Sequence, residues 1–476
     1  MIVRIARREL IEWARDERLR WLAGLCLLLM MSLTLMGWQS TQSEIRLRET
    51  AVAGDLENFL EQGRKNPHAA AHFGQYAFRP TLLPAAIDPG VSAWMGTMIW
   101  LEAHRRNLPE FRPADEGTVD GPASVLSVSW VLQYLLPLLL IVGGFATVAG
   151  ERERGTLALL MAQGVPLRTL LAGKSLAIAG AVSALLSPLI VALICLYLLA
   201  PDFVDMHGSG VRLTGMALLY LLYALGFIGL VLCVSLAAAT ARIALLTLLV
   251  LWVGLVVFVP RFAADAAAAA HPLPMASEFW SAIKRGEGAE VSSDVPQERA
   301  ARLRASLAAE LLEQYNVERV EDLPVNFTAV YLQRLEEADA PIFDHAYGEL
   351  WKKQEQQRAV RSRFGMLSPA VSLREVSMGL AGTDPFALSH FSQAAEAHRR
   401  TLVSELNGIQ AREGAGPGFY VAEADTWQKI QRFRYTPPSA KDVIRRHRLD
   451  IALLFVWAFV PLGLAMLLAG RARPIR

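Results

Sequence analysis

The stretch that decides the fold is LTGMALLYLLYALGFIGLVLCVSLAAATARIALLTLLVLWVGLVVFVP, residues 213–260, in which Arg242 is the only charged residue. A hydrocarbon core about 30 Å thick needs about 20 apolar helical residues, so this stretch is long enough for two spans joined by a short turn. The whole chain of 476 residues agrees, because 53% of it is hydrophobic and only 19% is charged. This composition excludes an ordinary soluble protein and predicts an integral membrane protein.

Six apolar runs of sufficient length predict an α-helical integral membrane protein with six transmembrane helices. The predicted spans are residues 21–38, 126–149, 175–200, 213–239, 243–260 and 449–469. A signal peptide is the alternative for the first run, but the acidic residues before it and the distance to a small-residue cleavage site favour a retained span.

Lys and Arg in the short loops predict the orientation, because these side chains resist translocation. Segments 1–20, 150–174 and 470–476 carry them, so both termini and the loop 150–174 are expected in the cytoplasm. Three arginines at the outer mouth of the last span disagree, but they end a long segment, where the rule is weak. They are Arg445, Arg446 and Arg448.

Residues 1–20 are expected to form an interfacial helix on membrane lipid, because apolar residues recur at helical spacing between Val3 and Trp13. Segments 39–125 and 261–448 are then extracytoplasmic. Together they predict a mainly helical domain built from two insertions, in which the Pro- and Gly-rich first segment leaves an α+β arrangement with short strands open.

Charge and cysteine content exclude two further classes of protein. Lys and Arg number 47 against 45 Asp and Glu, so no basic field indicates a nucleic-acid partner. The three cysteines each lie inside an apolar run, without the paired spacing of a zinc or redox site.

The loop after the second span carries the most distinctive motif, ERERGTL at residues 151–157. Leu157 and Leu160 form an apolar flank, and Gly164, Val165 and Pro166 form a turn. Because proline suits a first helical turn, a second short helix is expected from Pro166 to Gly173. Such a helix, turn and helix is suited to a groove on a soluble partner.

With GVPLR at 164–168 and GKS at 173–175, this loop resembles the cytoplasmic signature of ABC-2-type ABC transporter permeases. The resemblance implies a coupling helix that contacts a dimer of ABC nucleotide-binding subunits. ATP and Mg would then bind in that partner, with no cofactor in this chain, and a second permease copy or a homologous permease would complete the complex. The residues expected to make the contact are Glu151, Glu153, Gly155, Thr156, Leu157, Leu160 and Pro166.

Several other stretches resemble a subgroup of this family with a large extracytoplasmic domain of unknown function. They are HFG at 72–74, FRP at 78–80, DPG at 88–90, LEAH at 101–104 and the region 367–384. The resemblance implies a bacterial inner membrane protein and leaves both the cargo and a periplasmic partner open.

The expected function is therefore that of an exporter permease rather than an enzyme. AGKS at 172–175 does not make an ATP site, because a phosphate-binding loop needs a glycine where this chain has Arg168. The spans also lack a central charged residue of the kind that ion-coupled transporters use. The alternative is an ATP-driven mechanical transducer that acts on an extracytoplasmic partner without carrying a substrate.

His68 and His72 are four residues apart, which on a helix is a metal-ligand spacing, and Glu102 or His104 could complete a site. Two ligands are weak evidence, and histidines so spaced are more often surface or hydrogen-bonded residues. No metal is therefore assigned to the chain, and His68, His72 and His104 remain its candidates.

Overall fold

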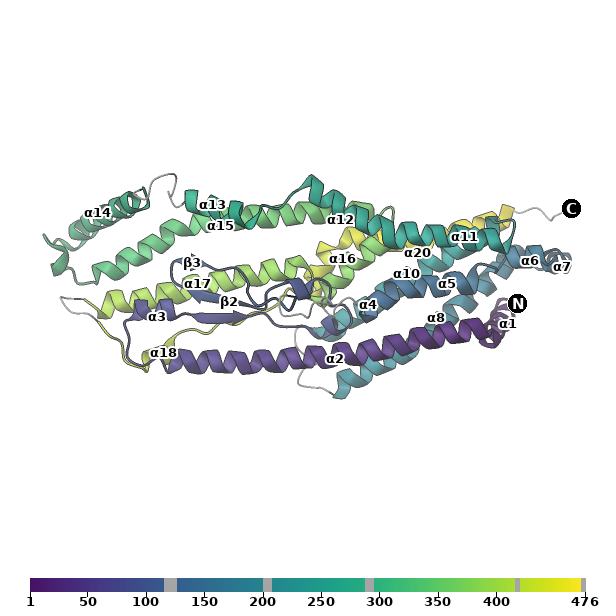
Figure 1. The fold of residues 1–476 in the computed structure, drawn as a ribbon, viewed down its shortest axis with the longest axis horizontal. Coiled ribbons are helices and arrows are strands. Elements are labelled where there is room, and N and C mark those ends of the chain that lie inside the picture. Colours follow the sequence, from purple (N-terminus) through teal and green to yellow (C-terminus); the bar gives the residue numbers. More distant parts are fainter. Residues whose placement is uncertain (115–125, 200–207, 287–294, 416–419, 472–476) are drawn as a thin grey trace.

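The structure is a computed structural model that describes residues 1–114, 126–199, 208–286, 295–415 and 420–471. These residues form an elongated, mostly helical molecule (Figure 1). The N-terminus and the end of the last helix lie at the same end, which we call the proximal end, and the opposite end is the distal end.

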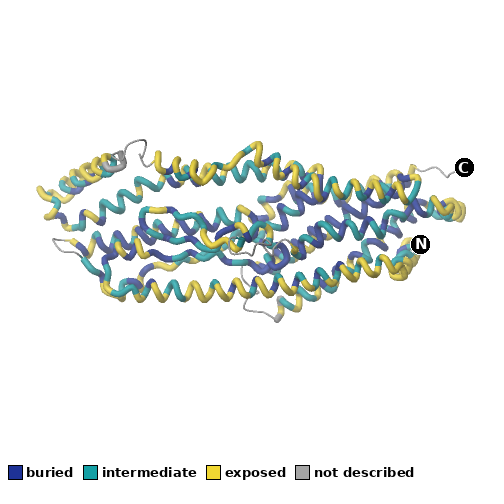
Figure 2. The backbone as a smooth tube through the Cα atoms, in the orientation of Figure 1, coloured by how far each residue is buried: buried dark blue, intermediate teal, exposed yellow. Residues whose placement is uncertain are grey.

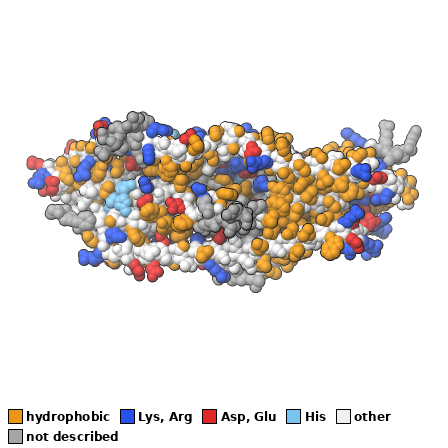
Figure 3. All heavy atoms as spheres, in the orientation of Figure 1, with side chains coloured by type: hydrophobic (Ala, Val, Ile, Leu, Met, Phe, Trp, Pro, Cys, Tyr) orange, Lys and Arg blue, Asp and Glu red, His pale blue; other side chains and the backbone are white. Residues whose placement is uncertain are grey.

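Six helical segments in the described residues are long and apolar enough to cross a membrane, as the sequence predicts. They are Glu17–Leu60, Val128–Glu153, Leu167–Leu196, Ser209–Ala237, Ala241–Ala270 and Arg448–Arg471. Apolar side chains cover the surface over this part of the molecule, and Lys, Arg, Asp and Glu gather at the proximal tip (Figure 3). The chain is thus built as a multi-pass membrane protein.

The elements of the spans and of the proximal end follow one another in a simple order. They are α1 (Ile2–Arg15), α2 (Glu17–Leu60), α4 (Val128–Trp130), the π-helical η4 (Val131–Leu135), α5 (Leu136–Gly144), α6 (Ala149–Glu153), α7 (Thr156–Ala162), α8 (Leu167–Leu199), α10 (Ser209–Ala237), α11 (Ala241–Trp252), the π-helical η5 (Val253–Phe258), α12 (Val259–Ala270) and α20 (Arg448–Arg471).

The remaining elements form what we call the distal domain. They are α3 (Pro67–Phe73), β1 (Gln75–Phe78), the 3₁₀ turns η1 (Leu83–Ala86) and η2 (Ser92–Trp94), β2 (Met98–Glu102), β3 (Arg105–Arg106), α13 (Ala276–Gly286), α14 (Val295–Tyr315), the 3₁₀ turn η6 (Val320–Asp322), α15 (Phe327–Phe364), α16 (Pro369–Ala381), α17 (Pro385–Glu413), α18 (Thr426–Lys429) and α19 (Ala440–Arg446).

Two helices are longer than the sequence predicts. The helix of the first span does not stop near Trp38 but continues as α2 to Leu60, because the polar residues beyond the apolar run still favour helix. The second short helix expected between Pro166 and Gly173 does not exist as a separate unit. Those residues are the first turns of α8, which runs to Leu199 without a break.

The distal domain contains short strands, which are the α+β alternative for the Pro- and Gly-rich first segment. An antiparallel sheet has the order β1-β2-β3, with Gln75 opposite Leu101 and Leu101 opposite Arg106. Leu101 and Phe391 of α17 are both buried in the small core between sheet and helix. In the same domain, Leu307 and Leu311 of α14 are buried against the start of α15.

The helix α10 lies at the centre of the bundle, where Figure 2 shows the most buried backbone. Its neighbour α20 approaches closely because α10 presents glycines to it. A Cβ atom on Gly229 would lie 2.6 Å from the backbone nitrogen of Leu462, and one on Gly226 would lie 3.0 Å from the carbonyl oxygen of Trp457. Small residues of this kind let membrane helices pack backbone to backbone.

Two spans contain π-helical turns, and side chains from neighbouring helices donate hydrogen bonds to their carbonyl groups. In η4, Tyr223 donates to the carbonyl of Gln133 at 2.8 Å, and Trp252 donates to the carbonyl of Tyr134 at 3.2 Å. In η5, the hydroxyl of Ser368 donates to the carbonyl of Leu255. A π turn disturbs the regular backbone ladder, so these bonds replace partners in a place without water.

We expect Gly229→Ala to destabilise the bundle, since its new methyl group must push α20 away. Overpacking of this kind costs about 1–3 kcal/mol, more than the ~1 kcal/mol that alanine gains in a helix. The matched control is Gly463→Ala on α20, where a Cβ meets no atom within 4 Å. Thermal unfolding of the two purified variants in detergent tests this, and equal melting temperatures would contradict the packing.

Candidate functional site

The motif of residues 151–157 lies at the proximal tip, in what we call the coupling element, residues 149–166. The helix α6 ends at Glu153, and α7 begins at Thr156. Gly155 between them has a φ of +73°, a conformation that glycine adopts without steric cost. The glycine therefore allows the chain to turn sharply and restart as α7.

Glu151 and Thr156 hold this turn together from the inside. The Thr156 hydroxyl donates to the Glu151 carboxylate and lies 3.1 Å from the Glu151 carbonyl oxygen. Leu157 is buried in the main apolar cluster of the bundle, and Leu160 packs partly against it. These residues fix α7 on the bundle rather than present it to a partner.

A buried ion pair ties the element to the N-terminal helix. Lys174 on α8 donates to the Glu9 carboxylate of α1, and its Nζ lies 3.5 Å from Oε1 of Glu151. The Lys174 side chain is only 3% exposed. Lys174 is therefore a buried cation between two carboxylates.

The helix α1 forms where the sequence predicts, and it packs along α8. A Cβ on Gly173 would lie 2.6 Å from the Ile5 side chain, and one on Gly143 would lie 2.6 Å from the Trp13 ring. The apolar side of α1 thus faces the bundle, and the Lys174 ion pair connects this helix to the coupling element.

Two charged residues of the motif bind the next helical turn. Arg152 donates to the carbonyl groups of Leu236, at 2.7 Å, and of Ala238, at the end of α10. A Glu153 carboxylate oxygen accepts a bond of 3.2 Å from the backbone N–H of Ala241, at the start of α11. A carboxylate at a helix N-terminus is favourable, so Glu153 has a structural role although its side chain is exposed.

The outward face of α7 is composed of residues that the sequence analysis did not select. Leu159 is 59% exposed and is flanked by small and polar residues. The exposed residues around it are Arg154, Ala158, Ala162 and Gln163. Of the predicted contact residues, Glu153, Gly155 and Pro166 are exposed, Glu151, Thr156 and Leu160 are partly buried, and Leu157 is buried. The helical periodicity of α7 is the signal that separates the two faces.

At the junction of the spans and the distal domain, the buried Asp88 connects three chain segments. Its carboxylate accepts hydrogen bonds from Ser129 of α4 at 3.1 Å, from Ser377 of α16, and from the backbone N–H of Gly90 at 3.1 Å. Burial raises the pKa of Asp88 although these bonds oppose the shift. Ser377 also bonds the Tyr220 hydroxyl of α10 at 3.1 Å, so the network reaches the centre of the bundle.

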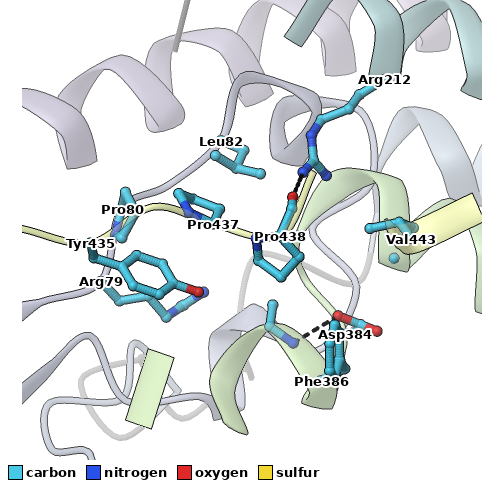
Figure 4. A pocket seen from close by; sticks show the side chains of 13 residues that line it. Arg79, Pro80, Leu82, Arg212, Asp384, Phe386, Tyr435, Pro437, Pro438 and Val443 are labelled. Atoms are coloured by element: carbon cyan, nitrogen blue, oxygen red, sulfur yellow. Dashed lines mark hydrogen bonds between the residues drawn. The ribbon is translucent and has the colours of Figure 1, made fainter. Parts of the chain in front are cut away.

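A small pocket at the same junction is lined by Arg212, at the start of α10, and by residues of the distal domain (Figure 4). The Arg212 guanidinium donates to the carbonyl of Leu380 at 2.9 Å and to that of Pro438. Asp384 caps α17 by accepting from the Ala387 N–H at 3.0 Å. These contacts hold the start of α10 against the distal domain, so the residues that line the pocket have a structural role.

The structure brings the three candidate histidines together in the distal domain. His68 and His72 lie on the helix α3, and His104 lies in the turn between β2 and β3. Each ring offers one ligand nitrogen, and the three nitrogens lie within 4.8 Å of one another. Glu102 is not part of this group. Histidine side chains gather in one patch on the face drawn in Figure 3.

Burial favours the neutral form of two of the three rings. Burial lowers the pKa of His68 although its hydrogen bond with Asn407 opposes the shift, and burial followed by the proximity of His104 lowers the pKa of His72. Burial works against the Glu336 carboxylate, but the hydrogen bond from His104 and the charge of Arg399 lower its pKa to about 2.

Residues 276–436 match the sequence model of a family described as a domain of unknown function, DUF3526. The chain is similar to that family from α13 to the segment before α19, which is most of the helical part of the distal domain and none of the spans. No curated protein matches the chain. The family description names no activity.

We expect Lys174→Met to loosen α1, because the change leaves Glu9 and Glu151 without their buried cation. Removing one partner of a buried pair costs about 3–5 kcal/mol. The control Glu12→Ala breaks the exposed Arg8–Glu12 pair on the same helix, which contributes at most about 1 kcal/mol, and it leaves every tryptic site of α1 in place. Thermal unfolding and the rate of tryptic cleavage within α1 measure both effects, and equal stability of the two variants would refute the role of Lys174.

Proposed function

We propose that the chain is the permease subunit of an ABC exporter in a bacterial inner membrane. Separate nucleotide-binding subunits, holding ATP and Mg, would dock on the coupling element, and a second permease would complete the transporter. The observation that carries the proposal is that the two faces of α7 differ. Its inner face packs on the bundle, and its outer face leaves Leu159 exposed at the proximal tip.

The contacts of the coupling element give a route for mechanical coupling. A push on α7 reaches α8 and α1 through Glu151 and Lys174, reaches α10 through Arg152, and reaches α11 through Glu153. Three of these are span helices, so the element cannot move alone. This is the property that a subunit closing on ATP would use to change the arrangement of the spans.

In the proposed orientation, the proximal end is cytoplasmic and the distal domain is extracytoplasmic. Two of the three arginines that oppose this orientation have acidic partners: Arg446 pairs with Glu355, and Arg445 lies 3.7 Å from the Asp442 carboxylate. Their charge is therefore partly compensated in the folded chain.

The helix α2 supports a second candidate, a mechanical transducer that moves no substrate through itself. With 44 residues at 1.5 Å each, α2 is about 66 Å long, more than twice the ~30 Å hydrocarbon core. One rigid helix thus connects the proximal end with the distal domain. Such a helix suits transmission of force to an extracytoplasmic partner.

We expect Leu159→Glu to reduce co-purification of the nucleotide-binding subunit at least tenfold. The change places a charge in the middle of the proposed contact and removes no bond within the chain. Tagged protein purified gently from its native membrane, followed by mass spectrometry and an ATPase assay of the eluate, measures the loss. Glu153 is the weaker choice for this test, because its loss would also remove the acceptor of the Ala241 N–H at the start of α11.

The control is Leu47→Glu on the part of α2 beyond the predicted span, where the leucine is 70% exposed. It makes the same chemical change away from the coupling element and should leave partner and ATPase activity unchanged. Equal retention of an ATPase by wild type and Leu159→Glu would rule out docking at α7.

Sealed inverted vesicles separate the two candidate functions. An exporter accumulates cargo inside when ATP is added, and mass spectrometry of the vesicle contents detects it. A transducer hydrolyses the same ATP without accumulation. Accumulation that depends on ATP and is lost in Leu159→Glu supports the exporter, and hydrolysis with unchanged contents supports the transducer.

A further inference from the structure

We propose that His68, His72 and His104 form a binding site for a divalent transition-metal cation, with Zn²⁺ as its best fit. The site lies in the distal domain, far from the coupling element, and holds whether or not the chain works with an ATPase (Figure 1). It has three nitrogen ligands and one open position.

The first argument is the distance between two ring nitrogens. Nε2 of His68 lies 3.3 Å from Nε2 of His104. Two imidazole ligands at 2.0–2.1 Å on a tetrahedral Zn²⁺ have their nitrogen atoms about 3.3–3.4 Å apart. The pair therefore has the separation that a shared cation would set. The His72 ring stands 4.8 Å from that of His68 and 5.1 Å from that of His104, measured between ring centres.

The second argument is the set of bonds behind the rings. Nδ1 of His68 lies 2.9 Å from Oδ1 of Asn407, and Nδ1 of His104 lies 3.0 Å from Oε1 of Glu336. Both oxygens can only accept hydrogen bonds, so each Nδ1 carries a proton and a neutral ring presents a lone pair on Nε2. Two such lone pairs facing each other repel unless a proton or a metal cation lies between them. Metal-bound histidines are typically oriented in this way by a carboxylate or an amide oxygen.

The Glu336 carboxylate, which orients the His104 ring, is itself held in place by further hydrogen bonds. It accepts from the backbone N–H of His104, and its other oxygen lies 3.1 Å from the buried guanidinium of Arg399. His104 has a φ of +65°, which is unusual for a residue with a side chain. The turn thus keeps a strained conformation that aims the His104 ring at α3, and strain of this kind concentrates at functional sites.

The donor set selects the class of metal. Imidazole suits Zn²⁺, Cu²⁺ and Ni²⁺, whereas Mg²⁺ and Ca²⁺ prefer oxygen. Cys26, Cys195 and Cys233 all lie on span helices, so no thiolate is present to favour a softer ion. His72 is exposed, which leaves the fourth position open to water or to an external donor.

A bound cation would join four elements that are distant in sequence. His68 and His72 belong to α3 and His104 to the β2–β3 turn, while Glu336 of α15 and Asn407 of α17 support the rings. The metal would therefore fix the sheet side of the distal domain to its two longest helices.

The test uses the full chain in detergent, purified without a histidine tag, stripped with chelator and titrated calorimetrically with Zn²⁺. We expect one equivalent to bind with a micromolar or smaller Kd and to raise the melting temperature, since a ligand of the folded state stabilises it. Co²⁺ in place of Zn²⁺ should give the strong visible absorption of a tetrahedral ion.

Because His72 is exposed, His72→Ala should fold normally while weakening Zn²⁺ binding by about 100-fold or more, and His345→Ala, an exposed histidine of α15 outside the cluster, should bind as wild type. Glu336→Gln should weaken binding about 10–100-fold. Absence of binding at 100-fold molar excess of Zn²⁺, or equal affinity of His72→Ala and His345→Ala, overturns the proposal.

Discussion

The position of the distal domain on the spans depends on one buried carboxylate, that of Asp88. A charged group out of water needs hydrogen bonds on all sides, and Asp88 obtains them from α4, from α16 and from its own loop. The same loop bonds the end of α16 again, where the Thr383 hydroxyl donates to the Asp88 carbonyl at 3.0 Å. Because Ser377 also reaches Tyr220 of α10, the domain is fixed to the most buried helix of the bundle.

The spans and the helical nature of the second long segment could be predicted, because each rests on local periodicity or length. The long-range contacts could not. DPG at 88–90 and GTD at 382–384 each stand out in the sequence, but nothing in either stretch shows that they meet. The sequence offers both Glu102 and His104 as a third ligand, and the distance of His104 from the other histidines depends on how β2 pairs with its neighbours.

The coupling motif shows why a matching sequence pattern does not by itself identify a contact surface. Glu151, Thr156 and Leu157 serve the internal turn, and Glu153 accepts a hydrogen bond from the first turn of α11 while remaining exposed. Leu159, which no pattern selected, is the apolar residue that α7 offers to the outside. The pattern located the element, and the packing of α7 determined which of its residues are free to meet another protein.

The π-helical turns of η4 and η5 have a consequence for how the spans can rotate. A π turn holds one residue more than a regular turn, so converting it to regular α-helix would turn the part of the span beyond it by about 100° around the helix axis. Tyr223, Trp252 and Ser368 each donate a hydrogen bond to one carbonyl of these turns, and these bonds help to fix the rotation of two spans about their own axes. Ser368 directly precedes α16. A shift of the distal domain would therefore break the hydrogen bond from Ser368, and the fifth span could then turn about its own axis without bending.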